Sequence, residues 1–152
     1  MRELLIQLLV AFVSTVAFSF LYELPVRYIF VTASISTLAY LGYYLVFPTV
    51  GYAGATLLAA AVVTLFSRIA APTFRIPLTT FLIPALFLLV PGKDVFYAAY
   101  YLIKQRIDEG LASAGRAIVV SGAIVFGIAL VYVIPQKVFN IFRRTQKTPE
   151  RK

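Results

Sequence analysis

The chain has 152 residues, of which 61% are hydrophobic and 13% are charged, and its formal net charge is +8. A soluble domain carries about a quarter charged residues, so this composition excludes most soluble classes and predicts an integral membrane protein. Cys and His do not occur, which excludes disulfides, thiol chemistry and histidine-based metal sites, and we expect neither a metal nor a cofactor.

The first apolar run covers residues 4–22 and has the length of a membrane-spanning helix, which is about 20 residues. It is long for a signal peptide and lacks a clean cleavage site, so we interpret it as a permanent helix. The motif "LYELPVR" ends this helix. Pro25 cannot continue it, and Glu23 and Arg27 mark a boundary with water.

Two more spanning helices are predicted at 27–46 and 50–69, and Pro48 separates them. Both runs are apolar over their whole length, and the connection between them carries no charge. The later helix also has small residues four positions apart, which is the pattern of a helix-packing face. These residues are Gly51, Ala55 and Ala59.

A fourth helix is predicted at 78–104, around the stretch "FLIPALFLLVPGKDVFYAAYYL". The part before the Pro-Gly pair has only about 14 apolar residues, too few to span a bilayer alone. Continued through the pair, the segment is long enough, and the break then falls near the middle of the membrane. Pro91 removes a helical N–H, Gly92 admits unusual dihedral angles, and Pro84 weakens the preceding turn. We therefore predict a transmembrane helix that is broken at Pro91-Gly92.

The break has the residue types of an anion site. Broken membrane helices commonly form substrate sites, because unpaired backbone persists only where protein or water surrounds it. A second half-helix with Asp94 as its N-cap would point free N–H groups at the break, and Lys93 would lie beside them. A polar stripe at helical spacing would lead from there to the outer surface. It consists of Tyr97, Tyr101, Lys104 and Asp108.

An alternative for the same stretch is an amphipathic helix at 93–109 that lies on the membrane surface. Lys93 and Asp94 would then pair among lipid headgroups and bind nothing, and the tyrosines would form an aromatic belt. The residues of this stretch allow both interpretations.

After the polar hinge "KQRIDEG" a fifth helix is predicted at 113–134, where it ends before Pro135. Ala123 and Gly127 give it a second small-residue packing face. Arg116 lies near its outer end, where a long side chain can reach water, and it is a candidate for binding a substrate anion. The candidate substrate-binding residues are therefore Pro84, Pro91, Gly92, Lys93, Asp94, Tyr97 and Arg116.

The basic residues predict the orientation in the membrane, because cytoplasmic connections are rich in Lys and Arg. The chain divides into a transmembrane helical domain at 1–135 and a basic cytoplasmic tail at 136–152. With five crossings and the tail inside, the N-terminus lies outside, and Arg68 and Arg75 fall in a cytoplasmic connection. The basic charges form no face for nucleic acid, and the tail instead fits contact with anionic lipid.

The motif "LYELPVR" and the later "RIPLTTFLIPALFLLVPGKDVFYAAY" resemble the threonine/serine exporter family. More narrowly, they resemble its small YjjB-type subunit, which corresponds to the C-terminal half of the fused exporters. The resemblance covers roughly 12–135, and Pro25 and Arg27 match it after the first helix. The pair Lys93-Asp94 departs from the small uncharged residues expected there. The most specific pattern consists of Ile83, Pro84, Val90, Pro91, Gly92 and Tyr97.

This resemblance implies a subunit of a secondary-active exporter for small carboxylate-bearing metabolites, either threonine and serine or a dicarboxylate such as succinate. It implies a bacterial or archaeal cytoplasmic membrane and a larger YjjP-type partner subunit. Five helices cannot hold two equal inverted repeats, so a second copy of the chain is the other possible partner. Two alternatives are a non-transporting scaffold or assembly subunit and a homo-oligomeric channel. No nucleophile–base pair is visible, so we expect no enzyme.

Overall fold

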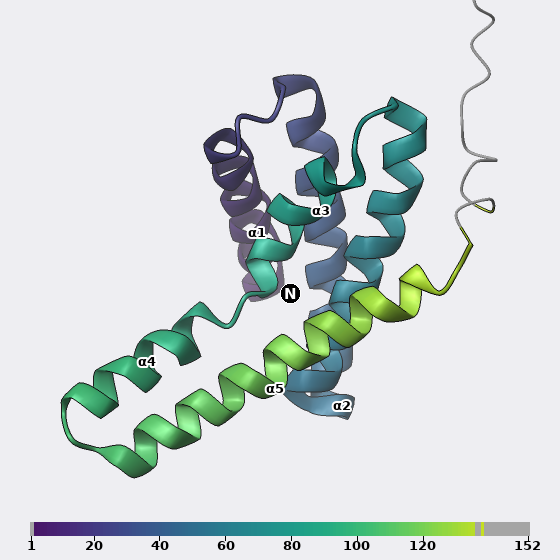
Figure 1. Cartoon of the computed structure of the whole chain (residues 1–152). Coiled ribbons are helices and arrows are strands. Elements are labelled where there is room, and N and C mark those ends of the chain that lie inside the picture. The colour runs from purple at the N-terminus through teal and green to yellow at the C-terminus, as the bar shows by residue number, and fades with distance from the viewer. Residues whose placement is uncertain (1, 136–137, 139–152) are drawn as a thin grey trace, which may run out of the picture.

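The described part of the chain contains helices and no strands. The computed structural model describes residues 2–135 and 138, so most of the predicted tail at 136–152 lies outside the described residues. The all-α class is confirmed. The helices follow in the order shown in Figure 1: α1 Arg2–Leu21, α2 Val26–Phe74, α3 Leu78–Leu86, the 3-10 helix η1 Phe87–Leu89, α4 Gly92–Ile103 and α5 Ile107–Tyr132.

Helix α2 reverses its direction at Gly51. This residue has φ 72° and ψ −173°, a conformation that is essentially restricted to glycine. In a straight helix Gly42 and Leu58 would lie about 24 Å apart. A Cβ added to Gly42 would instead lie 3.5 Å from Leu58 Cδ2. Helix α2 therefore consists of two antiparallel segments, visible in Figure 1, which agree with the helices predicted at 27–46 and 50–69.

Gly51 does not belong to the packing face predicted for it. No atom lies within 4 Å of a Cβ added at Gly51, whereas Ala55 and Ala59 are fully buried. The prediction was wrong for Gly51. A glycine at this spacing can serve close helix packing, but it can also serve a backbone conformation with positive φ. Here the chain reversal determines the residue.

A helix interruption is present at Pro91-Gly92, as predicted. The chain tightens into η1 before the break, and the two helical parts on either side are bent by 51°. Pro91 has no N–H, and the N–H of Gly92 donates to the carbonyl of Val90 at 2.8 Å, so helical hydrogen bonding does not continue across the pair. That both parts form one membrane crossing stays a prediction.

Three helices, α1, α2 and α5, are long and apolar enough to cross a membrane. The bent pair of α3–η1 and α4 gives a fourth candidate if both parts belong to one span. Large apolar side chains are exposed along α1, α4 and α5, which is the arrangement expected where lipid surrounds the helices. The described residues thus form a helical membrane protein.

Helices α4 and α5 form a hairpin that projects from the other helices in Figure 1. Its turn contains Gln105 with φ 59°, and the N–H of Arg106 donates to the carbonyl of Tyr101 at 2.9 Å. This pattern satisfies the last carbonyls of a helix and stops it. The helix predicted at 93–109 in the alternative considered above is therefore divided between α4 and α5, and the position of α4 in or on the membrane stays a prediction.

Helix α5 begins six residues earlier than the predicted start at 113. The chain is already helical at Ile107, with Asp108 and Glu109 in the first turn. Acidic side chains are favourable there, because a helix N-terminus carries partial positive charge. The stretch "KQRIDEG" was interpreted as a polar hinge, because charged residues occur both in loops and in the first turn of a helix. The predicted polar stripe accordingly ends with α4, because Lys104 caps that helix and Asp108 belongs to α5.

Helix α5 packs closely across α2. A Cβ added to Gly127 would lie 2.4 Å from the carbonyl oxygen of Leu57, so this contact requires a glycine. Near the end of the same interface, Arg68 donates from Nη1 to the carbonyl oxygen of Val131 at 2.6 Å and lies over the ring of Tyr132. Arg68 is only 3% exposed. Its predicted place in a cytoplasmic connection was wrong, because α2 continues to Phe74 and buries it.

A buried chain of hydrogen bonds joins α1, α2 and α3. Thr15 Oγ1 donates to Ser36 Oγ at 2.9 Å, and Ser36 Oγ donates to the carbonyl oxygen of Ala85 at 3.3 Å. Both hydroxyl side chains are at most 1% exposed. Polar contacts of this kind hold helices together where an apolar solvent gives no hydrophobic drive. They fix α3, and with it the break that follows.

Candidate functional site

A hollow of about 420 Å³ lies between α4 and α5, directly after the helix break. This volume is within the range of small-ligand sites. The hollow carries two basic side chains and one carboxylate, together with three hydroxyl groups. Its lining consists of Lys93, Asp94, Tyr97 and Tyr101 from α4 and Ser113 and Arg116 from α5.

Arg116 and Asp94 form an ion pair across this hollow. Arg116 Nε lies 3.3 Å from Asp94 Oδ1, and Arg116 Nη2 donates to Ser113 Oγ at 3.1 Å. The Asp94 side chain is 13% exposed, whereas that of Arg116 is 57% exposed. The pair is therefore a single long contact, in which Arg116 keeps an accessible surface for another anion.

The carboxylate of Asp94 also interacts electrostatically with Tyr52 of α2. Tyr52 follows the reversal at Gly51, so the turn of α2 brings this phenol to the start of α4. Three helices thus contribute to the surroundings of Asp94. Sequence analysis gave no signal for Tyr52, because nothing in a single chain links positions 52 and 94.

Asp94 is not the N-cap of α4, contrary to the sequence prediction. The N-cap is Pro91, and no side chain caps the helix start. Asp94 lies in the first turn, where its carboxylate is directed to Arg116. The helix begins earlier because Gly92 and Lys93 are compatible with helical dihedrals directly after Pro91. Lys93 and the N-terminal end of α4 remain side by side, which favours an anion at this point.

The structure brings four of the predicted residues together: Lys93, Asp94, Tyr97 and Arg116. Pro91 and Gly92 adjoin them at the start of α4. Of the residues that were not predicted as binding residues, Ser113 is three positions before Arg116. This helical spacing was a usable signal.

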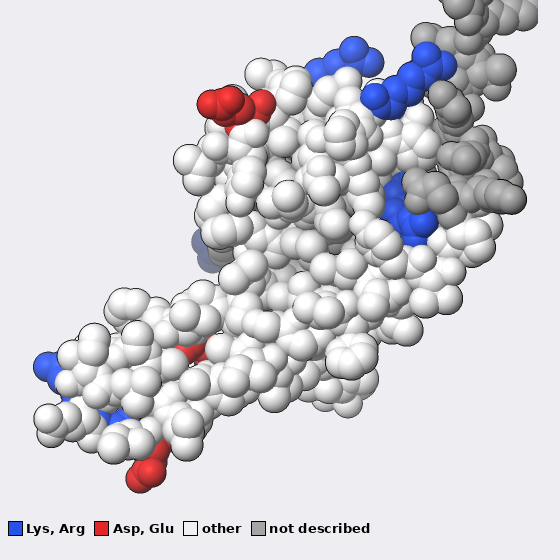
Figure 2. All heavy atoms as spheres, viewed as in Figure 1, with Lys and Arg blue, Asp and Glu red and all other residues white. Residues whose placement is uncertain are grey.

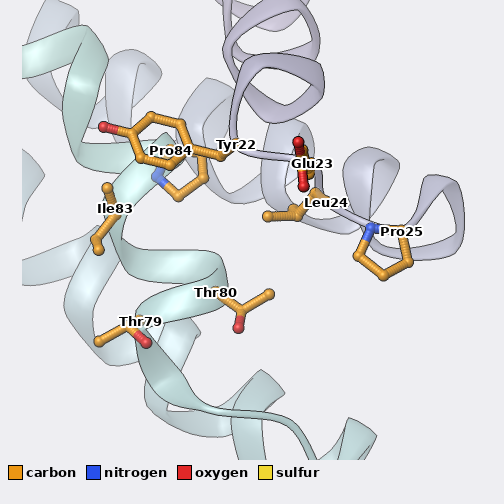
Figure 3. Close-up of a pocket in the computed structure, with 8 residues that line it drawn as sticks. All are labelled: Tyr22, Glu23, Leu24, Pro25, Thr79, Thr80, Ile83 and Pro84. Atoms are coloured by element: carbon orange, nitrogen blue, oxygen red, sulfur yellow. The ribbon is translucent and has the colours of Figure 1, made fainter.

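Pro84 lies apart from this hollow, and its predicted part in substrate binding stays a prediction. It is buried in α3 and lines a separate hollow of about 320 Å³ beside the α1–α2 connection. Figure 3 shows Pro84 beside Tyr22 and Glu23, and Thr79 and Thr80 lie nearer the start of α3. A proline in the helix interior acts on the backbone near its own position, and α3 carries this position away from the break.

Charged side chains are few on the visible face of the molecule. Figure 2 shows most of them at the end with the α1–α2 connection and over the α4–α5 hairpin, and single charged side chains lie between these two groups. Among the described residues, no group of three or more acidic side chains lies together in a way that could hold a metal ion. The side chains that line the hollow provide fixed charges and hydroxyl groups.

The family model described as "Threonine/Serine exporter, ThrE" matches residues 7–134, which is most of the chain. The chain belongs to the threonine/serine exporter family. No curated protein and no solved structure matched it. The matched range includes most of α1, all helices from α2 to α5 and both sides of the hollow.

Membership of the threonine/serine exporter family confirms the resemblance seen in the sequence and supports a role in membrane transport. Exposed apolar helices agree with this role. The α4–α5 hollow carries fixed positive charge and lies directly after the helix break.

Proposed function

We propose that the chain is a subunit of a secondary-active exporter and that the α4–α5 hollow binds the carboxylate of its substrate. The observation that carries this proposal is the arrangement of Lys93 and Arg116 around a cavity at the N-terminal end of α4. Two basic groups face a single carboxylate, Asp94, so the hollow has an excess of positive charge. A helix N-terminus adds to this preference for an anion.

The substrate carboxylate would replace Asp94 on Arg116. A guanidinium binds a carboxylate best through two parallel N–H donors. Asp94 makes only one contact of 3.3 Å with Arg116, so the exchange gives Arg116 a better partner. Asp94 keeps its interaction with Tyr52 during this exchange. Arg116 would therefore exchange an internal for an external carboxylate, and Asp94 would keep Tyr52 as its neutral partner.

Five crossings are the topology that we infer for this subunit. Helix α2 counts twice because it reverses at Gly51, and α3–η1 and α4 count once as a broken span, with α1 and α5 completing the set. The break then lies within the membrane, where backbone departures from a helix need protein or water around them. The hollow next to the break meets that requirement.

A second subunit would complete the transporter, either a larger YjjP-type partner or another copy of this chain. Five helices do not divide into two equal inverted halves, which is the usual basis of alternating access. The substrate would be threonine or serine, or a dicarboxylate such as succinate. The membrane would be the cytoplasmic membrane of a bacterium or an archaeon.

Everted membrane vesicles from the native host provide the test, because they retain any partner and turn export into uptake. We expect Arg116→Ala and Lys93→Ala to raise the KM for the transported carboxylate by roughly tenfold or more, since a charged hydrogen bond contributes about 1.5–3 kcal/mol. Lys104→Ala is the matched control, because Lys104 is a basic residue outside the hollow. Threonine and succinate are measured in parallel, at equal membrane abundance of each variant.

Wild-type kinetics in both hollow variants would remove the proposed site. If the chain is a scaffold subunit, both variants should keep wild-type transport kinetics, and transport should be lost only when assembly is disturbed. A homo-oligomeric channel predicts carboxylate flux that persists after an uncoupler dissipates the ion gradient. Secondary active transport predicts that the uncoupler abolishes accumulation.

A further inference from the structure

A second, smaller cavity of about 160 Å³ lies between α2 and the end of η1. It is on the other side of the break from the start of α4. Its side chains carry no formal charge, and hydroxyl groups come from both segments of α2. The lining consists of Tyr40, Tyr43, Tyr52, Thr56, Leu88, Leu89 and Val90.

The break leaves the carbonyl group of Leu88, a residue that lines this cavity, without its helical donors. The N–H groups three and four residues after Leu88 belong to Pro91, which has none, and to Gly92, whose N–H donates to Val90. The carbonyl oxygen of Leu88 therefore has no continuing helical hydrogen bond. A carbonyl in apolar surroundings needs a donor or a cation. The negative end of the α3–η1 dipole lies at the same point.

The tyrosines of this cavity form a compact aromatic cluster. The ring centroids of Tyr40 and Tyr43 are 5.8 Å apart and stacked, and those of Tyr43 and Tyr52 are 6.4 Å apart and edge to face. Aromatic faces attract ammonium groups and other cations. Thr56 Oγ1 donates to the carbonyl oxygen of Tyr52 at 2.8 Å, which leaves its lone pairs as acceptors.

Tyr52 connects this cavity to the carboxylate of the first hollow. It lines the small cavity and also interacts electrostatically with Asp94. A cation in the small cavity would therefore feel the negative charge of Asp94 and, with opposite sign, the charge of its ion-pair partner Arg116. No Lys or Arg side chain lines the cavity itself.

We propose that this cavity is a subsite for one monovalent cationic group, held by the carbonyl of Leu88, the hydroxyl of Thr56 and the tyrosine rings. Its role in transport rests on the proposed function: an anion at the start of α4 and a cation at the end of η1 would use both ends of the broken helix. Its volume is below that of sites for whole metabolites and suits one small group. The group is either the ammonium of a zwitterionic substrate or a free alkali cation.

Cation binding by the purified full-length chain in lipid nanodiscs tests the subsite without any carboxylate. The chain has ten tyrosines and no tryptophan, and three of the tyrosines line this cavity, so tyrosine emission is a first readout of binding. Methylammonium chloride and sodium chloride are titrated at constant ionic strength against choline chloride, and calorimetry on the same samples gives a second readout. We expect saturable binding of at least one of the two cations. Thr56→Val should raise its Kd by roughly tenfold, because an acceptor is lost without a change in volume.

Thr64→Val is the matched control. Thr64 is a buried threonine on the same helix with the same type of backbone hydrogen bond, to the carbonyl of Ala60, and it does not line the cavity. Binding of methylammonium alone would identify the substrate's ammonium as the ligand, and binding of sodium alone would identify a free cation. Absence of saturation in both readouts, or equal effects of both threonine variants, would overturn the subsite. Neither result depends on the Arg116 and Lys93 transport variants, so the two proposals fail separately.

Discussion

Arg116 and Asp94 are separated by 22 positions, yet the α4–α5 hairpin brings them to 3.3 Å. A partly exposed pair with one long contact contributes little to folding, about 0–1 kcal/mol. Such a pair is therefore poorly explained as a stabilising element. It is better explained as a binding group for substrate, because a second anion can replace Asp94 on Arg116 without unfolding the hairpin.

Arg68 differs from Arg116, because its side chain is buried and donates a hydrogen bond to a backbone carbonyl. Arg68→Leu should lower the free energy of unfolding by about 2–3 kcal/mol, because the α2–α5 contact loses the charged hydrogen bond from Arg68 to the carbonyl of Val131. Thermal unfolding in detergent measures this change. Arg27→Leu, at an exposed arginine near the start of α2, should shift the midpoint much less. Equal shifts would show that Arg68 has no special structural role.

At the scale of the helices, a glycine contact fixes the position of α5, and with it the position of Arg116. The backbone of Leu57 lies where a side chain at 127 would have to be. Gly127→Leu should separate α5 from α2 and reduce the amount of folded protein, with a loss of more than about 3 kcal/mol. Size-exclusion profiles and melting temperatures in detergent measure this effect.

Gly122→Leu is the matched control for that variant. Gly122 lies on the same helix, and no atom is within 4 Å of a Cβ added there. We expect it to fold normally. A normal profile for both variants would contradict the packing of α5 on α2 described above.

The sequence predicted those elements whose cause is local. Pro48 marks a helix end three residues before the reversal, and Pro91 with Gly92 marks the break, because a missing N–H acts where it occurs. The start of α5 was missed, since acidic residues suit both a polar hinge and the first turn of a helix.

The site was predicted only in part for a similar reason. Lys93, Asp94 and Tyr97 share one stretch of chain, and Arg116 stood out as a charge in an apolar helix. The interaction of Asp94 and Arg116 with Tyr52 depends on the packing of three helices, which a pattern along one chain does not encode. Pro84 was grouped with them because it is near in sequence, although α3 separates it from the break.

At the scale of the whole molecule, the connections fall at two opposite ends. In Figure 1 the α1–α2 and α2–α3 connections lie at one end, and the reversal of α2 and the α4–α5 turn lie at the other. This alternation is what five crossings require. It places the basic end of α2, with Arg75, on the side where the positive-inside rule predicts the cytoplasm.

Single cysteines test this arrangement, because the chain has none of its own. Thr49→Cys and Gln105→Cys should react with an impermeant maleimide in right-side-out vesicles, and Arg75→Cys should react only in everted ones. All three positions are exposed. Reaction of Thr49→Cys and Arg75→Cys from the same side would exclude the crossing assigned to the second segment of α2 and refute the topology.

The most direct measurement of the central claim, a carboxylate in the α4–α5 hollow, is substrate protection of a cysteine at position 97. Tyr97 lines the hollow and is 37% exposed, whereas Lys104 is exposed outside it. Threonine or succinate should slow the labelling of Tyr97→Cys by an impermeant maleimide and leave Lys104→Cys unchanged. Identical labelling rates of Tyr97→Cys with and without both carboxylates would contradict the account.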